Sequence, residues 1–132
     1  MKARHIIATA LVAAAFATTA TAAAPKTKGI STKGNTTIVC TRGVVRGVKG
    51  YASDTPVKIY IEKGRITRIE TLPNQETPSI FARAEELLRR FIGKSTGEAQ
   101  NMKVDAVSGA TYSSKALINT VKGGLRYYEQ HK

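Results

Sequence analysis

The spacing of hydrophobic residues changes along this chain, and the change restricts the fold more than any other feature. Val57, Ile59 and Ile61 alternate with polar residues, which predicts a half-buried strand. Between residues 80 and 92 the apolar residues follow a helical period instead, with arginines and glutamates on the opposite face. A chain that passes from strands to helices predicts an α+β fold: a small antiparallel sheet with two helices packed on one face, in a single domain.

Two β-branched runs precede the alternating segment. Residues 37–41 and 44–48 are separated by Arg42-Gly43, which indicates either one strand with a bulge or two short strands. The segment before them is rich in small and polar residues, as flexible linkers are. Ordered structure is therefore expected to begin near Thr36.

A return strand is predicted after the alternating segment. Lys63-Gly64 suits a tight turn, with Gly64 at positive φ, and residues 65–72 follow it. The apolar residues of this strand do not alternate strictly; they are Ile66, Ile69 and Leu72. We expect a β-bulge or a twisted edge to account for that spacing.

Two helices are predicted in the second half of the chain. Thr77-Pro78-Ser79 suits a helix start and Gly93 suits its end. The expected inner face of this first helix comprises Ile80, Phe81, Ala84, Leu87, Leu88, Phe91 and Ile92. A polar loop follows, and the last helix is expected to begin near Ser113 or Ser114. Gly123-Gly124 weakens helix propensity inside it, and close packing against the sheet would justify the pair.

The N-terminal residues predict a secretory signal peptide. A short basic start, an apolar run through Ala17 and the small residues Ala20-Thr21-Ala22 occur in the order typical of such signals. An uncleaved N-terminal anchor is the alternative, although the apolar run is short for a membrane span. The predicted organisation is a signal peptide at 1–22, a flexible linker at 23–35 and one folded domain at 36–132.

Charge and residue content restrict the function. Loss of Lys2 and Arg4 with the signal lowers the formal charge from +12 by two, to +10. Such a charge favours acidic partners or membranes, or simply keeps the domain soluble. Export and scattered basic residues argue against nucleic acid. Cys40 has no partner for an internal disulfide, and the positions of the two histidines, His5 and His131, argue strongly against a Ser-His-Asp or Cys-His site.

Residues 105–114 read Asp-Ala-Val-Ser-Gly-Ala-Thr-Tyr-Ser-Ser and carry the clearest functional signal. Gly109 permits a sharp bend and Ala110 leaves room beside it. Thr111 presents a hydroxyl just ahead of the last helix, with Ser113 or Ser114 as cap candidates. The N-terminus of a helix suits a phosphate because its N–H groups and its dipole both favour an anion. The alternative is an ordinary loop that enters a helix, where these residues are common.

This motif resembles the acceptor sequence of the FMN-binding domain family, which includes the C subunit of sodium-translocating NADH:quinone reductase and the G subunit of Rnf-type complexes. The matching residues are Asp105, Ser108, Gly109, Ala110 and Thr111. The resemblance extends over roughly residues 43–129, including Gly50-Tyr51 and Glu76-Thr77-Pro78. It implies FMN joined to Thr111 through a phosphoester, and Asp105 near Mg²⁺ while FMN is attached. It implies no metal in the mature protein.

The resemblance also suggests residues around the flavin ring. Glu76 and Thr77 are expected to contact it or to shape the turn, and Tyr112 to stack on it or to lie at the rim or in the core. The complete expected site is Asp105, Ser108, Gly109, Ala110, Thr111, Tyr112, Ser113, Glu76 and Thr77. The chain departs from the family pattern at three positions that concern the pocket's shape: Ala52, Ser53 and Ser79.

The resulting prediction is an exported flavoprotein of the periplasm or another extracytoplasmic space, soluble or peripherally bound to a membrane. Its FMN comes from FAD by means of a flavin transferase, and it exchanges electrons with a membrane or soluble redox partner, for which an acidic surface would suit the charge. The absence of a recognisable catalytic pair favours a carrier or redox subunit over a self-contained enzyme. The alternatives are a cationic cell-envelope binding module without redox work, and a flavin-dependent reductase with its own small substrate.

Overall fold

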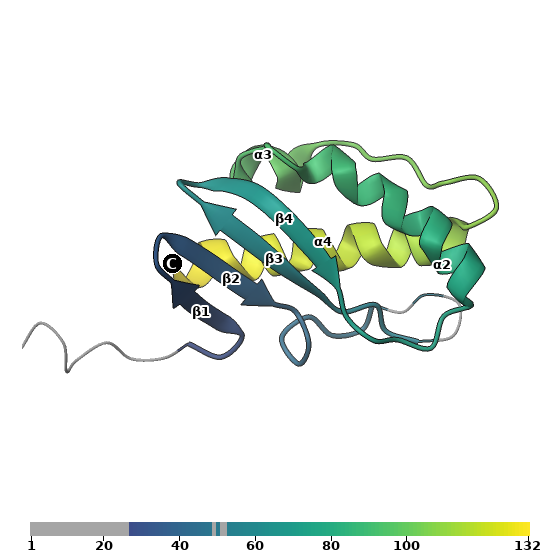
Figure 1. Cartoon of the computed structure of the whole chain (residues 1–132), viewed down its shortest axis with the longest axis horizontal. Helices are drawn as coiled ribbons and strands as arrows, with labels where there is room; N and C mark the ends of the chain where they lie inside the picture. Colours follow the sequence, from purple (N-terminus) through teal and green to yellow (C-terminus); the bar gives the residue numbers. More distant parts are fainter. Residues whose placement is uncertain (1–26, 49, 51–52) are drawn as a thin grey trace, which may run out of the picture.

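The computed structural model describes residues 27–48, 50 and 53–132. These residues form an antiparallel four-stranded sheet in the order β1-β2-β3-β4, drawn in Figure 1. The strands are β1 (Ile30–Lys33), β2 (Thr36–Cys40), β3 (Val57–Glu62) and β4 (Arg65–Thr71). Each strand pairs with the next one along the chain, as a meander. The predicted signal peptide lies outside the described residues.

The hairpin between β3 and β4 agrees with the prediction in detail. Lys63 and Gly64 both have positive φ, at 53° and 76°, which is the backbone of a tight two-residue turn. The register shifts between Tyr60 and Ile61, so β4 carries a bulge. Because of that shift, Ile59 faces Ile69 while Ile61 faces Ile66. The bulge therefore explains the irregular apolar spacing of this strand.

The helices are α2 (Pro78–Glu85), the 3-10 helix η1 (Glu86–Phe91), α3 (Thr96–Asn101) and α4 (Thr111–His131). Helix α4 runs behind the sheet in Figure 1, with α2 and α3 alongside it. Its Gly124 lies so close to β3 and to the residue after β2 that an added Cβ would stand 2.8 Å from Thr41 Cγ2 and 2.9 Å from Ile59 Cδ1. Close packing against the sheet thus explains this glycine.

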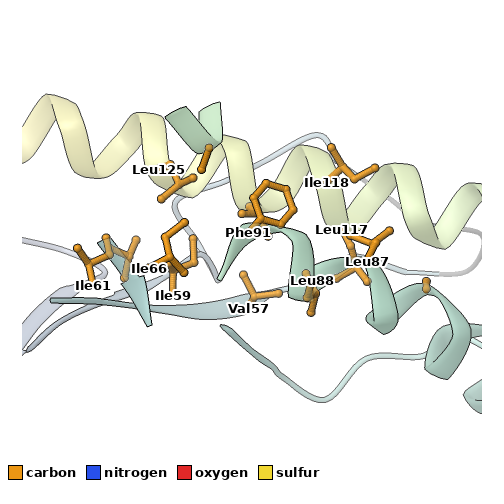
Figure 2. Packing of buried hydrophobic residues seen from close by; sticks show 14 of the residues in the cluster. Val57, Ile59, Ile61, Ile66, Leu87, Leu88, Phe91, Leu117, Ile118 and Leu125 are labelled. Carbon is orange, nitrogen blue, oxygen red and sulfur yellow. The ribbon is translucent and has the colours of Figure 1, made fainter. Parts of the chain in front are cut away.

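One hydrophobic core joins the inner face of the sheet to the helices. Figure 2 shows side chains from β3, β4, η1 and α4 converging between the two layers. The largest fully buried side chains include Phe91, Ile59, Ile61, Ile66, Leu117 and Leu125. Burial along β3 alternates strictly, as its sequence predicts. The predicted α+β class, with helices on one face of a small antiparallel sheet, is confirmed.

Several predicted boundaries are wrong. Order does not begin near Thr36, because Ile30–Lys33 already pairs with β2 as an edge strand. Residues 44–48 form turns rather than a strand, since Gly43 and Gly47 take positive φ and redirect the chain. The loop after Gly93 contains the short helix α3, capped by the side chain of Ser95.

The predicted helix over 80–92 is also different in detail. It changes from α to 3-10 geometry at Glu86. The helix ends at Phe91, and Ile92 follows it in extended backbone and is 41% exposed instead of buried. Ile80, at the other end, is 40% exposed. Helix α4 begins at Thr111, so Ser113 and Ser114 are buried helical residues and not caps.

Candidate functional site: a cavity at the start of helix α4

A folded loop leads into α4. The Ala110 N–H donates to the Val107 carbonyl at 2.9 Å, and the Val107 N–H donates to the Ser114 hydroxyl at 3.0 Å. Gly109 has φ +82°, a left-handed conformation that favours glycine. These contacts fix the loop against the helix it precedes. The backbone leading to Thr111 is therefore held by contacts within the chain.

The first turn of α4 has the features of an anion site. The first intrahelical hydrogen bond in it runs from Ser114 N–H to the Ala110 carbonyl at 2.9 Å. The N–H groups of Thr111, Tyr112 and Ser113 precede that bond and lie at the positive end of a 21-residue helix. The cap residue is Ala110, whose side chain has no oxygen to accept from them. A phosphate beside Thr111 would lie at this positive end of the helix, where N–H groups and the helix dipole favour an anion.

A cavity of about 260 Å³ opens at this turn. Its walls come from the start of α2 and from the loop and first turn of α4; the lining residues are Thr77, Ile80, Gly109, Ala110, Thr111, Tyr112 and Ser113. Tyr112 is 68% exposed, so two large apolar side chains, Tyr112 and Ile80, meet solvent at one cavity. Exposed apolar surface that lines a cavity is a common mark of a ligand site.

Glu76 is a buried residue that binds the first turn of α4 through Ser113. It is 5% exposed, and its carboxylate accepts hydrogen bonds from the Ser53 N–H and the Ser113 hydroxyl, both at 2.8 Å. Gly50 fits against it, because a Cβ there would stand only 2.1 Å from Glu76 Oε1. The carboxylate thus joins the segment before β3, the loop before α2 and the start of α4. It does not line the cavity, and its contact with a flavin ring stays a prediction.

The structure brings together most of the residues predicted for the site, but not all of them. Thr77, Gly109, Ala110, Thr111, Tyr112 and Ser113 line the cavity. Asp105 and Ser108 lie in the same loop, are exposed and do not line it. Thr77 is the N-cap of α2, with extended backbone and Pro78 after it. The Thr111 hydroxyl is on an exposed residue, accessible to an enzyme that would modify it.

Two residues at this site were missed by the sequence analysis. Ile80 was assigned to the inner face of its helix, and Arg83 to the solvated face. Ile80 instead forms a wall of the cavity. Arg83 reaches across to the α4 loop, where its Nη1 lies 2.7 Å from the position that a Cβ on Gly109 would occupy. Helical periodicity gives no signal for either contact, because both depend on where α4 lies relative to α2.

Fold and site together define a small α+β domain with a phosphate-compatible cavity at a helix N-terminus. A family model for the FMN-binding domain matches residues 50–126, which is more than half of the chain. The chain belongs to the FMN-binding domain family, and the resemblance found in its sequence is confirmed. The matched range contains β3, β4, the cavity and all residues named in the predicted site.

The chain is also similar to a subunit of a known redox complex. The chain is 27% identical over 97 residues to the G subunit of an ion-translocating oxidoreductase complex from Shewanella piezotolerans (strain WP3 / JCM 13877). The alignment covers 63% of this chain and 46% of that protein, so the chain matches about half of the relative's length. No solved structure matches the chain. None of the helices in residues 27–132 that the structure describes has the length and apolar character to span a bilayer.

Proposed function

We propose that this protein carries FMN covalently on Thr111 and transfers electrons to or from a redox partner. One observation supports the linkage above others: an exposed threonine hydroxyl is on the first residue of α4 and lines the 260 Å³ cavity. The phosphate end of FMN would face the helix N-terminus, and the ring would lie along Ile80 and Tyr112. The relative's name as part of an ion-translocating oxidoreductase complex supports the electron-transfer role.

The attachment step needs a flavin transferase and FAD. The Thr111 oxygen forms a bond to the phosphorus on the FMN side of FAD, and the P–O bond of the pyrophosphate breaks. AMP leaves, and the hydroxyl proton passes to a base of the transferase. Asp105 is proposed to assist the Mg²⁺ that accompanies the phosphoryl donor, since this metal prefers carboxylate and phosphate oxygens. The exposure of both residues agrees with access by another enzyme.

The bound flavin would supply reversible redox chemistry, and the chain's own residues would position it. The loop contacts of Val107 and Ala110 hold the attachment point, and Glu76 holds the turn beneath it. Tyr112 lines the cavity and is largely exposed, so a redox partner could approach the site from that side. This arrangement favours a carrier or redox subunit, and the partner is proposed to be a membrane or soluble protein that donates or accepts electrons.

The location is part of the proposal. A signal peptide over residues 1–22 would export the domain, leaving a chain that begins near Ala23. The remaining linker and the domain would then lie outside the cytoplasm, either soluble or peripheral to a membrane. N-terminal sequencing of exported protein tests this part separately, and a chain that still begins at Met1 would contradict it.

Intact-mass measurement tests the central claim. The full chain is coexpressed with a flavin transferase, and its mass is expected to rise by one FMN less one water. Thr111→Ala is expected to keep the unmodified mass and to lose all flavin on denaturation. Thr67→Ala is a matched control, because Thr67 is an exposed threonine on β4, away from the cavity. Flavin that survives denaturation of Thr111→Ala would show that the attachment site is elsewhere.

A further inference from the structure

Arg83 lies beside the loop that leads to Thr111, against Gly109, which lines the cavity. It is an exposed residue of α2, and its Nη1 covers the open side of Gly109, two residues before Thr111. Within residues 27–48, 50 and 53–132 the side chain of Arg83 has no hydrogen-bond or ion-pair partner. A guanidinium positioned against this loop offers a full positive charge and N–H donors beside the start of α4.

Gly109 makes this approach feasible. A Cβ at residue 109 would stand 2.7 Å from Arg83 Nη1, so any larger residue would push the guanidinium away. The positive φ of Gly109 also turns the backbone so that Ala110 and Thr111 follow directly at the helix start. The same glycine therefore bends the loop and lets a cation approach the first turn of α4.

The charges at this point are complementary to a phosphate diester. A flavin linked through Thr111 would carry one negative charge on its phosphate, close to the helix N-terminus. The N–H groups of the first turn offer partial positive charge from one side. A guanidinium offers a full charge and paired N–H donors from another side, in a geometry that suits phosphate oxygens.

We propose that Arg83 binds the phosphate of the flavin attached to Thr111, and that it binds the same phosphate of FAD before the bond forms. This inference rests on the proposed function. The helix N-terminus and Arg83 would hold the phosphate between α4 and α2, so the linkage would not depend on the loop alone. Arg83 would then join two elements that sequence analysis treats separately.

The experiment compares Arg83→Ala, Arg83→Lys and the control Arg89→Ala with the unchanged protein. Arg89 is an exposed arginine on η1, and its loss changes the net charge equally. Neither arginine lines the cavity, but only Arg83 lies against Gly109. Two quantities are measured: the rate of flavin attachment in a purified transferase assay, and the phosphorus NMR signal of the finished phosphodiester. Thermal unfolding of each unmodified variant verifies that the fold is retained.

The expected result for Arg83→Ala is an attachment rate about tenfold lower, since hydrogen bonds to charged groups have about that effect. Its phosphorus signal is expected to shift, while Arg89→Ala matches the unchanged protein in both quantities. Arg83→Lys is expected to be intermediate, because it keeps the charge and loses the paired donors.

Results that contradict the role of Arg83 can be distinguished from results that contradict the proposed function. No flavin on the unchanged protein would overturn the proposed function itself. Normal flavin on Thr111, with Arg83→Ala equal to Arg89→Ala in rate and phosphorus signal, would overturn only the role of Arg83. A slower rate with an unchanged phosphorus signal would assign Arg83 to recognition by the transferase, and this would also overturn the phosphate contact.

Discussion

The Glu76 carboxylate accepts a hydrogen bond of 2.8 Å from the hydroxyl of Ser113, and this contact joins the loop before α2 to the first turn of α4. The second carboxylate oxygen accepts from the Ser53 N–H. A buried acceptor that serves two donors leaves both of them unsatisfied when it is removed. The site's geometry therefore depends on a residue that does not line the cavity.

Replacement of Glu76 by alanine is expected to lower the free energy of unfolding by about 2 to 3 kcal/mol, because the buried Ser113 hydroxyl and the part-buried Ser53 N–H lose a charged acceptor. Glu76→Gln keeps one acceptor oxygen and is expected to cost less. Urea unfolding of the unmodified protein gives both values. Glu86→Ala, at an exposed glutamate of η1, is the control and should change stability little. Equal effects at Glu76 and Glu86 would contradict this account.

Asp105→Asn is expected to slow flavin attachment more than it alters the finished flavoprotein, because the proposed role is confined to the Mg²⁺-bound donor. The measurement is the rate of attachment by purified transferase. Asp54→Asn is the matched control, at the chain's other aspartate, which is also exposed. If Asp105 only satisfies backbone groups of its loop, thermal stability would fall and the rate would stay the same.

Gly124→Ala is expected to destabilise the fold by about 1 to 3 kcal/mol, because the new methyl group would overlap Thr41 and Ile59. Gly97→Ala is expected to have the opposite sign. Apart from its chain neighbours and its own helix backbone, no atom of the described residues lies within 4 Å of a Cβ at that position in α3. Alanine favours a helix by up to about 1 kcal/mol over glycine. Thermal unfolding of both variants is sufficient, and destabilisation by Gly97→Ala would count against the packing argument.

The acid stability of the fold is expected to depend on Glu129. Hydrogen bonds from Lys132 and then Thr96 lower the pKa of the Glu129 carboxyl. A lowered pKa in the folded state stabilises the fold at pH above the carboxyl's usual range, and this contribution is lost as the pH falls through the folded value. Thr96→Val removes the 2.7 Å bond from Thr96. The difference in Tm between Thr96→Val and the unchanged protein should therefore shrink on acidification; a constant difference would contradict this.

Electron transfer with an acidic partner is expected to slow as salt rises. A groove lined in part by Arg46, Lys122 and Arg126 gathers basic charge beside α4, and charges are screened beyond about 10 Å at about 0.1 M salt. Stopped-flow rates of the unchanged protein should fall with ionic strength, while the flavin potential changes little. The double change Arg46→Glu and Arg126→Glu should lower the rate at low salt and have little effect at high salt. A rate independent of salt would leave the charge as a solubility feature.

The central hairpin could be predicted from sequence because its signals are local. Alternation in β3 and the Lys63-Gly64 turn depend only on neighbouring residues. The strand β1 could not be predicted in the same way. Its residues Ser31, Thr32 and Lys33 are polar and exposed, and they become a strand only because β2 is present to pair with them.

The backbone angles of glycines also determine secondary structure that the residue composition does not predict. Residues 44–48 are rich in valine, yet Gly43 and Gly47 turn the chain and prevent a strand. The spacing of residues 80–92 indicates a helix but does not distinguish α from 3-10 winding, so the exposure of Ile92 was not predictable. In each case the local structure is determined by a backbone angle or a packing contact, and the spacing of hydrophobic residues carries no information about either.

The family, the fold class and the threonine proposed to carry the flavin could all be read from contiguous chain, because a ten-residue motif and two hydrophobic periods are local properties. Which other residues meet that threonine depends on the packed fold. Ile80 and Arg83 of α2 reach the α4 loop, and Glu76 reaches Ser113, only after α2 packs against α4. These contacts join residues far apart in the chain, and their positions follow from how the core packs rather than from any local spacing.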